Sequence, residues 1–127
     1  MLETNTASCG GFPGVSNAFV SALWSVDYAL QMASRSFSLA LFHIGGTSTF
    51  YNPFNWPPTS ATYLGWQTFP LYYAALVVTE ALGSANASRV IDLRTASAWY
   101  PGYAIYEVRL RCMTALTCRT MLQRGSF

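Results

Sequence analysis

Glu3 is the acidic residue of this chain whose surroundings best suit chemistry. The sequence contains only five acidic residues, and Glu3 is followed at once by a polar, glycine-rich stretch, TNTASCGG. Such a stretch is typical of the loop that follows a strand, and α/β barrels place their reactive groups at the carboxyl ends of parallel strands. Glu3 is therefore a candidate catalytic carboxylate. The alternative is a solvated side chain near the end of the chain.

Gly10 and Gly11 lie in the same stretch and could bind an anion. Glycine has no side chain, so its backbone N–H groups can approach a carboxylate closely. The alternative is that the two glycines only form a turn.

Tyr51 and Asn52 follow the apolar run FSLALFHI at residues 37–44, and they could line a pocket near its end. Their alternative role is packing within an aromatic loop. His43, at the end of the same run, is interpreted as a hydrogen-bonded core residue, and Cys9 as a loop residue without a partner to activate it.

The elements that would position these residues follow a strand–helix rhythm. The pattern predicts a strand end and glycine-rich loop over 1–15, a helix over 17–34 capped by Ser16, and a buried strand over 37–44. An aromatic loop over 47–66 comes next, followed by a helix over 67–82 with Pro70 in its first turn and Gly83 at its end. Residues 89–93 and 103–108 alternate like antiparallel strands. The first two units predict an α/β layer with parallel strands, and the change in character near residue 84 predicts a domain boundary.

Several segments of the chain resemble one known enzyme family. The segments are ETNTASCGGFPG, ALWSVDYALQMA, LFHIGG, YNPF, YYAALVVTEALG and YAIYE, in that order over residues 2–107. They are similar to the region around the nucleophile of glycoside hydrolase family 79, which includes β-glucuronidases and is related to heparanase. The resemblance implies a retaining hydrolase of β-glucuronides, with Glu3 as nucleophile and the Gly10–Gly11 loop at the uronate. No cofactor is expected.

The resemblance also implies a fold. Residues 1–83 would be the last two βα units of a (β/α)8 catalytic barrel, and residues 84–108 would begin a C-terminal β-sandwich domain. Residues 109–127 do not resemble the family. They hold four of the seven arginines and two of the three cysteines, and we expect an aberrant, disordered basic tail.

A retaining glycosidase needs a second carboxyl group as acid/base, about 5–5.5 Å from the nucleophile. In the family this is a Glu, usually after an Asn, on an earlier strand. Asp27, Glu80, Asp92 and Glu107 do not follow an Asn. We therefore expect a fragment that is inactive alone and whose natural partner is the missing N-terminal part of the same protein. The resemblance implies secretion of the intact protein, although the chain shows no signal peptide.

Composition excludes several other classes. Charged residues make up 9% of the chain and aromatic residues 16%, a composition typical of the interior of a larger protein. The arginines gather in the tail rather than over a face, which argues against nucleic acid. Glycines and prolines interrupt the uncharged stretch 36–79, among them Gly45, Gly46, Pro53, Pro57, Pro58 and Pro70, which argues against a membrane span. One histidine and three widely spaced cysteines argue against a metal site.

Two alternatives to an enzyme remain. One is a small secreted carbohydrate-binding protein whose aromatic loop stacks on sugars, through Tyr51, Phe54, Trp56, Tyr63 and Trp66. The other is an interaction peptide dominated by its basic tail. Glu3 favours the enzyme, because a sugar-binding module has no use for a carboxylate at a strand end.

Overall fold

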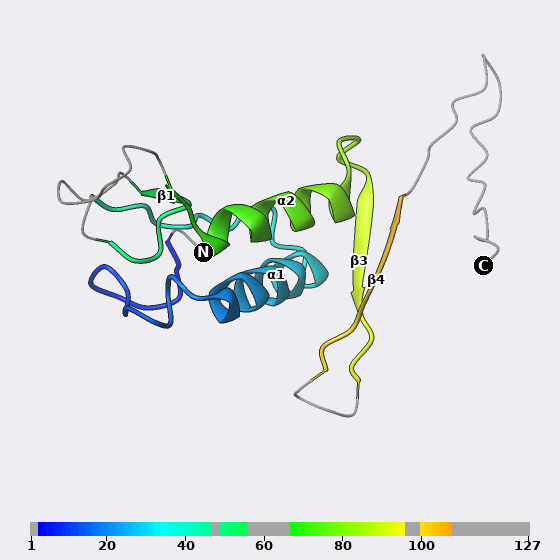
Figure 1. The fold of residues 1–127 in the computed structure, drawn as a ribbon. Helices are drawn as coiled ribbons and strands as arrows, with labels where there is room; N and C mark the ends of the chain where they lie inside the picture. The colour runs from blue at the N-terminus through cyan, green and yellow to red at the C-terminus, as the bar shows by residue number, and fades with distance from the viewer. Residues whose placement is uncertain (1–2, 47–48, 56–66, 96–99, 108–127) are drawn as a thin grey trace, which may run out of the picture.

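The computed structural model describes residues 3–46, 49–55, 67–95 and 100–107. Figure 1 shows two helices side by side and a two-stranded hairpin across the carboxyl ends of both. The elements, in chain order, are α1 (Phe19–Ser34), β1 (Phe54–Asn55), β2 (Gln67–Thr68), α2 (Pro70–Leu82), β3 (Ser88–Asp92) and β4 (Tyr103–Glu107). The predicted basic tail, 109–127, and most of the predicted aromatic loop lie outside the described residues.

Helix α1 confirms the helix predicted over 17–34, but Ser16 does not cap it. The N-cap is Ala18, which makes no side-chain hydrogen bond. Ser16 is instead 1% exposed, and its hydroxyl oxygen accepts hydrogen bonds from the Phe12 N–H at 3.0 Å and the Thr6 hydroxyl at 2.8 Å. The cap prediction was wrong because the glycine-rich loop folds back and uses this serine for its own backbone.

Helix α2 begins at Pro70 and ends before Gly83, which confirms the predicted end and the place of Pro70 in the first turn. Proline suits the first helical position because its missing N–H would have no partner there. Gly83 has φ +68°, a conformation that glycine adopts without strain. The residues before Pro70 were predicted as helix, and that was wrong: Gln67 and Thr68 pair antiparallel with β1.

The strand predicted over 37–44 is reduced to one parallel bridge between Thr4 and Phe42. The Thr4 N–H donates to the Leu41 carbonyl and the His43 N–H donates to the Thr4 carbonyl, both at 2.9 Å. A longer parallel ladder usually has a neighbour on each side of a strand. Within the described residues, these two extended segments have only each other.

The hairpin confirms the antiparallel strands predicted near residues 89–93 and 103–108, although burial alternates only along β3. β3 and β4 pair antiparallel over five residues each, with Val90 opposite Ile105. The Tyr103 hydroxyl fixes the hairpin to α1 by donating to Asp27 Oδ1 at 2.5 Å. Burial, and then the hydrogen bond to Asp27, raise the pKa of Tyr103 above its ordinary range.

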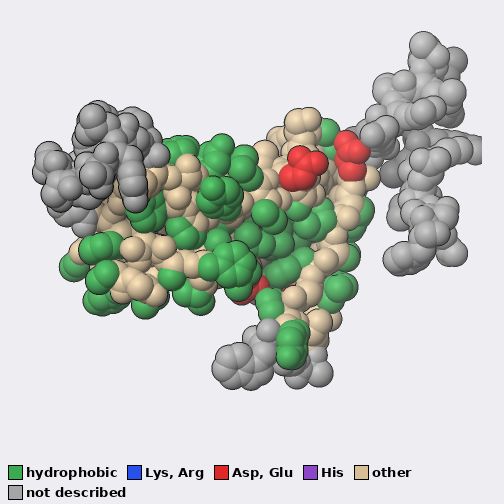
Figure 2. All heavy atoms as spheres, viewed as in Figure 1, with side chains coloured by type: hydrophobic (Ala, Val, Ile, Leu, Met, Phe, Trp, Pro, Cys, Tyr) green, Lys and Arg blue, Asp and Glu red, His purple; other side chains and the backbone are tan. Residues whose placement is uncertain are grey.

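The described residues bury few large apolar side chains and expose many. The buried apolar residues are Ala22, Leu30, Tyr51, Leu71 and Ala74, while seventeen large apolar or aromatic side chains are exposed. Figure 2 shows such side chains over the visible face of both helices and of the hairpin. Soluble monomers rarely expose so much apolar surface. No helix among the described residues has the length and apolar character needed to cross a bilayer.

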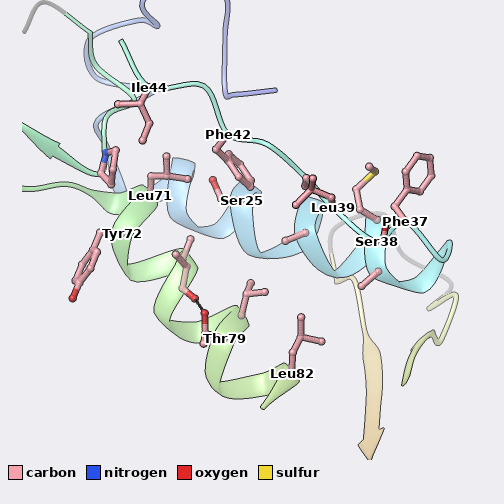
Figure 3. Close-up of a pocket in the computed structure, with 18 residues that line it drawn as sticks. Ser25, Phe37, Ser38, Leu39, Phe42, Ile44, Leu71, Tyr72, Thr79 and Leu82 are labelled. Carbon is pink, nitrogen blue, oxygen red and sulfur yellow. Dashed lines mark hydrogen bonds between the residues drawn. The ribbon is translucent and has the colours of Figure 1, made fainter. Parts of the chain in front are cut away.

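An apolar groove of about 400 Å³ lies between the two helices and the 37–44 segment. Figure 3 shows its lining: Ser25 of α1, then Phe37, Leu39 and Phe42 of the segment, then Leu71 and Leu82 of α2. Phe42 fills one wall and contacts Trp24 and Tyr28 of α1 edge-on, with ring centroids 6.3 Å apart in each pair. These contacts anchor the segment that ends at His43.

Candidate functional site

The bridge between Thr4 and Phe42 decides where the neighbouring side chains point. Phe42 packs against the rings of α1, so Phe42 and its bridge partner Thr4 face the helices. Side chains alternate along extended backbone, so those before and after the bridge point to the opposite face. Glu3, Asn5 and His43 therefore share the face turned away from the helices.

Glu3 and His43 meet on that face. His43 Nδ1 lies 3.3 Å from Glu3 Oε1, and the side chains are 45% and 69% exposed, respectively. Solvent at this exposure screens the pair, so its contribution to stability is small. Its importance is geometric: an imidazole N–H can orient a carboxylate at the end of two parallel segments.

Tyr51 closes the other side of His43. The two rings meet edge to face with centroids 6.0 Å apart, and Tyr51 is 5% exposed. The structure thus places the predicted site residue Tyr51 beside the group that contacts Glu3.

The glycine-bearing loop is held against the same place. The Phe50 N–H donates to the Gly10 carbonyl at 2.7 Å, which joins this loop to the segment that carries Tyr51. Gly10 has φ +92° and Gly11 φ +83°. A Cβ on Gly11 would lie 2.7 Å from Ser16 Oγ and 3.0 Å from Tyr51 Cδ1, so only glycine fits there.

The backbone N–H of Gly11 already has a partner in the loop. It donates to the Ser8 carbonyl at 3.1 Å, closing a turn. An anion at the Gly11 N–H would therefore compete with this turn. Whether Gly10 and Gly11 bind a uronate stays a prediction.

Asn52 is occupied by the protein itself. It is 3% exposed; Oδ1 accepts from the Gly45 N–H at 3.0 Å, while Nδ2 lies 3.1 Å from the Gly46 carbonyl and 3.0 Å from Asn55 Oδ1. These contacts fix the Gly45–Gly46 turn that follows His43. The structure gives Asn52 a part in shaping the site, and contact with a sugar stays a prediction.

The other four carboxylates of the sequence lie on the helices and the hairpin, not on the loops that carry Glu3, Gly10, Gly11 and Tyr51. Asp27 and Glu80 belong to α1 and α2, and Asp92 and Glu107 belong to the hairpin. Asp27 accepts from Tyr103, and Asp92 Oδ1 accepts from the Arg94 N–H at 2.9 Å. Glu3 is thus the carboxylate that the structure connects to the glycine-bearing loop, through His43 and Tyr51.

The structure also describes some of the residues considered for other chemistries. The described part of the chain holds no group of three potential metal ligands, and Cys9 is a free, exposed thiol. Of the residues suggested for sugar stacking, Tyr51 is buried on His43 and Phe54 packs on Tyr72 at 4.8 Å between centroids. Trp56, Tyr63 and Trp66 lie outside the described residues.

Three residues of the site were missed or misassigned by sequence reasoning. His43 was taken for a core residue, Ser16 for a helix cap, and Asn5 was not singled out. Asn5 donates to the His43 carbonyl at 2.8 Å. The signal for Asn5 was its spacing of two from Glu3, which places both on one face of an extended segment.

A carboxylate, an imidazole and a glycine-bearing loop lie around the bridge between two parallel segments, each followed by a helix. Enzymes of the α/β class carry their sites where parallel strands lead into helices. Comparison with known proteins makes this more specific. The chain is 35% identical over 106 residues, 82% of its length, to an Aspergillus niger protein named β-glucuronidase. It is 35% identical over 86 residues, 68% of its length, to a Neurospora crassa protein of the same name. The chain is therefore related to fungal β-glucuronidases.

The relationship concerns one part of those proteins. The chain spans 19% and 15% of the length of the two curated relatives. No model of a protein family matches the chain, and no solved structure matches it.

Proposed function

We propose that this chain carries the nucleophile of a retaining glycoside hydrolase of family 79 that acts on β-glucuronides. The observation that carries the proposal is the place of Glu3. It lies next to Thr4, the bridge residue of one of two parallel segments, and contacts His43, which Tyr51 connects to the glycine-bearing loop, in a chain related to fungal β-glucuronidases.

The fold we propose is the last two βα units of a (β/α)8 barrel over residues 1–83, followed by the start of a β-domain over 84–108. The parallel bridge at Thr4 and Phe42, with a helix after each segment, supports the barrel units. The antiparallel hairpin supports the change of architecture after residue 84. The exposed apolar side chains support a larger protein around this chain.

The chemistry assigned to Glu3 follows the retaining mechanism. A Glu3 oxygen attacks the anomeric carbon while the bond to the leaving oxygen breaks, and an acid protonates that oxygen. Water then attacks the glycosyl ester, gives its proton to the same acid/base group, and releases glucuronic acid with its configuration retained. We propose that the acid/base carboxyl comes from another part of a longer polypeptide.

Because Glu3 has no second carboxyl group beside it in the described residues, we expect that the 127-residue chain alone does not hydrolyse an aryl β-glucuronide. Without a proton donor and without the rest of the pocket, neither leaving-group departure nor substrate positioning is assisted. Release of the aryl group is the measurement. Turnover by the purified chain at a rate that Glu3→Gln abolishes would show that the chain is sufficient, and the need for an outside acid/base would be wrong.

The experiment that tests Glu3 is a graft. Residues 2–107 of this chain, which include Glu3, replace the corresponding segment of the Aspergillus niger relative, which supplies the rest of that enzyme. We expect the graft to hydrolyse an aryl β-glucuronide and Glu3→Gln to lower kcat by about 10³-fold or more. The matched control is Glu80→Gln, an exposed carboxylate on α2, which should leave kcat unchanged.

Covalent labelling gives an independent readout. An epoxide with the configuration of β-glucuronic acid should esterify the nucleophile of the graft, and mass spectrometry should find the adduct on the peptide that contains Glu3. Full activity in the Glu3→Gln graft, or an adduct on another residue, would remove Glu3 from the role of nucleophile.

A further inference from the structure

His43 is the one histidine of the sequence, and its ring lies between Glu3 and Tyr51. Nδ1 is 3.3 Å from Glu3 Oε1, longer than the optimum of about 2.9–3.0 Å for an N–H···O hydrogen bond. Catalytic hydrogen bonds are often long before substrate binds and shorten when it does. The ring therefore needs no large movement to bond the carboxylate.

Two hydrogen bonds hold the backbone of His43, and one ring contact supports its side chain. The His43 N–H donates to the Thr4 carbonyl at 2.9 Å, and Asn5 Nδ2 donates to the His43 carbonyl at 2.8 Å. Tyr51 then packs against the ring itself. Thr4 and Asn5, the two residues after Glu3, thus hold the backbone of His43, which keeps the ring close to the carboxylate.

We infer that His43 is a positioning residue for Glu3. Its neutral ring carries the proton on Nδ1, and this N–H donates a hydrogen bond to Glu3 Oε1. The hydrogen bond holds the carboxylate in one rotamer and leaves Oε2 for attack. Which ring nitrogen carries the proton is set by the hydrogen bond available to it. The catalytic meaning of this inference rests on the proposed function, whereas the pairing itself does not.

A purely structural role for His43 predicts something different. If the ring only filled space beside Tyr51, its tautomer would be independent of Glu3, and a neutral imidazole facing water would favour the proton on Nε2. The side chain of His43 is 45% exposed, so packing alone gives no reason for a proton on Nδ1. The tautomer therefore separates the two roles.

The test is the tautomer of His43 in the 127-residue chain, by nitrogen–proton correlation NMR above the titration range of the ring. With one histidine in the sequence, the spectrum contains a single imidazole. We expect Nδ1–H in the wild type and in Glu3→Gln, which keeps an acceptor. In Glu3→Ala the proton should move to Nε2 in most molecules. Glu80→Ala, on α2, is the matched control and should change nothing.

Two results would overturn the inference: Nε2–H in the wild type, or Nδ1–H that persists in Glu3→Ala. The His43 amide, bonded to the Thr4 carbonyl, reports whether the segment stays paired in each variant. If Glu3→Ala loosens it, Glu3→Met keeps the side-chain length without an oxygen and is read in the same way. The tautomer does not depend on turnover, so a graft that fails to hydrolyse glucuronides leaves this result standing, and the reverse also holds.

Discussion

Replacement of Gly11 by alanine should open the glycine-bearing loop. Gly11 has φ +83°, and an L side chain in this region costs roughly 1–2 kcal/mol. The added methyl would also lie 2.7 Å from Ser16 Oγ and 3.0 Å from Tyr51 Cδ1, and both side chains are buried. Overpacking of this kind costs about 1–3 kcal/mol. The expected destabilisation is therefore about 2–5 kcal/mol.

Gly14 provides the matched control. Its φ is +76°, but a Cβ there would meet nothing within 4 Å. Gly14→Ala should therefore cost only the backbone part, roughly 1–2 kcal/mol. The difference between the two variants isolates the steric contribution of Ser16 and Tyr51.

Hydrogen exchange of loop amides measures this cost without requiring global unfolding. The amides of Phe12, bonded to Ser16 Oγ, and of Ser16, bonded to the Phe12 carbonyl, report the closed loop. Because about 1.4 kcal/mol corresponds to a factor of ten, Gly11→Ala should accelerate their exchange by roughly 30-fold or more. Gly14→Ala should do so by about tenfold. Equal acceleration in both variants would refute the steric argument and leave only backbone strain.

Three further outcomes are expected. Tyr103→Phe should lower the stability of the chain at neutral pH by about 1–2 kcal/mol, because Asp27 loses its hydrogen bond. Because the pKa of Tyr103 is raised in the folded chain, this stabilisation is present below the unfolded pKa of 10.0 and is lost as the pH rises above it. In urea unfolding, the difference in stability between Tyr103→Phe and wild type should therefore narrow above pH 10. A difference that stays constant with pH would contradict this. Asn52→Leu should remove protection of the Gly45 amide from hydrogen exchange, because leucine has no acceptor, and a protected amide would show that Asn52 does not fix this turn. In the grafted enzyme, azide should restore turnover to Glu3→Gly but not to Glu3→Gln, because only the glycine variant leaves room for a small nucleophile. The product should be the inverted glycosyl azide. Equal rescue of both variants would place the nucleophile elsewhere.

The local elements could be predicted because their signals lie within a few residues. Apolar spacing located α1, Pro70 and Gly83 indicated the first turn and the end of α2, and alternation located the hairpin. The extent of pairing over 37–44 could not be predicted in the same way. It depends on which other segment comes alongside, and Thr4 and Phe42 are far apart in the chain.

The candidate site was predicted in part. Contacts in the structure connect Glu3, Tyr51 and the Gly10–Gly11 loop. The side chain of Asn52, in contrast, is hydrogen-bonded to the backbone of the turn that follows His43. The role of His43 was not predicted, because a lone histidine in an apolar run gives no sign of the face to which its side chain points. That direction follows only from the packing of Phe42 against α1, which leaves the next side chain on the opposite face.

The contacts around the site form one continuous chain, and this explains why a glycine far from the carboxylate matters to it. Ser16 and Tyr51 both pack where a Cβ on Gly11 would lie. Tyr51 in turn supports the ring of His43, which reaches Glu3. Gly11→Ala should therefore displace Tyr51 and loosen His43. In the Gly11→Ala chain, the fraction of molecules with the proton on His43 Nδ1 should fall, even though Glu3 is unchanged. Gly14→Ala, whose added methyl touches nothing, should keep the wild-type tautomer. A His43 spectrum identical in both variants would mean that the loop and the Glu3–His43 pair are independent.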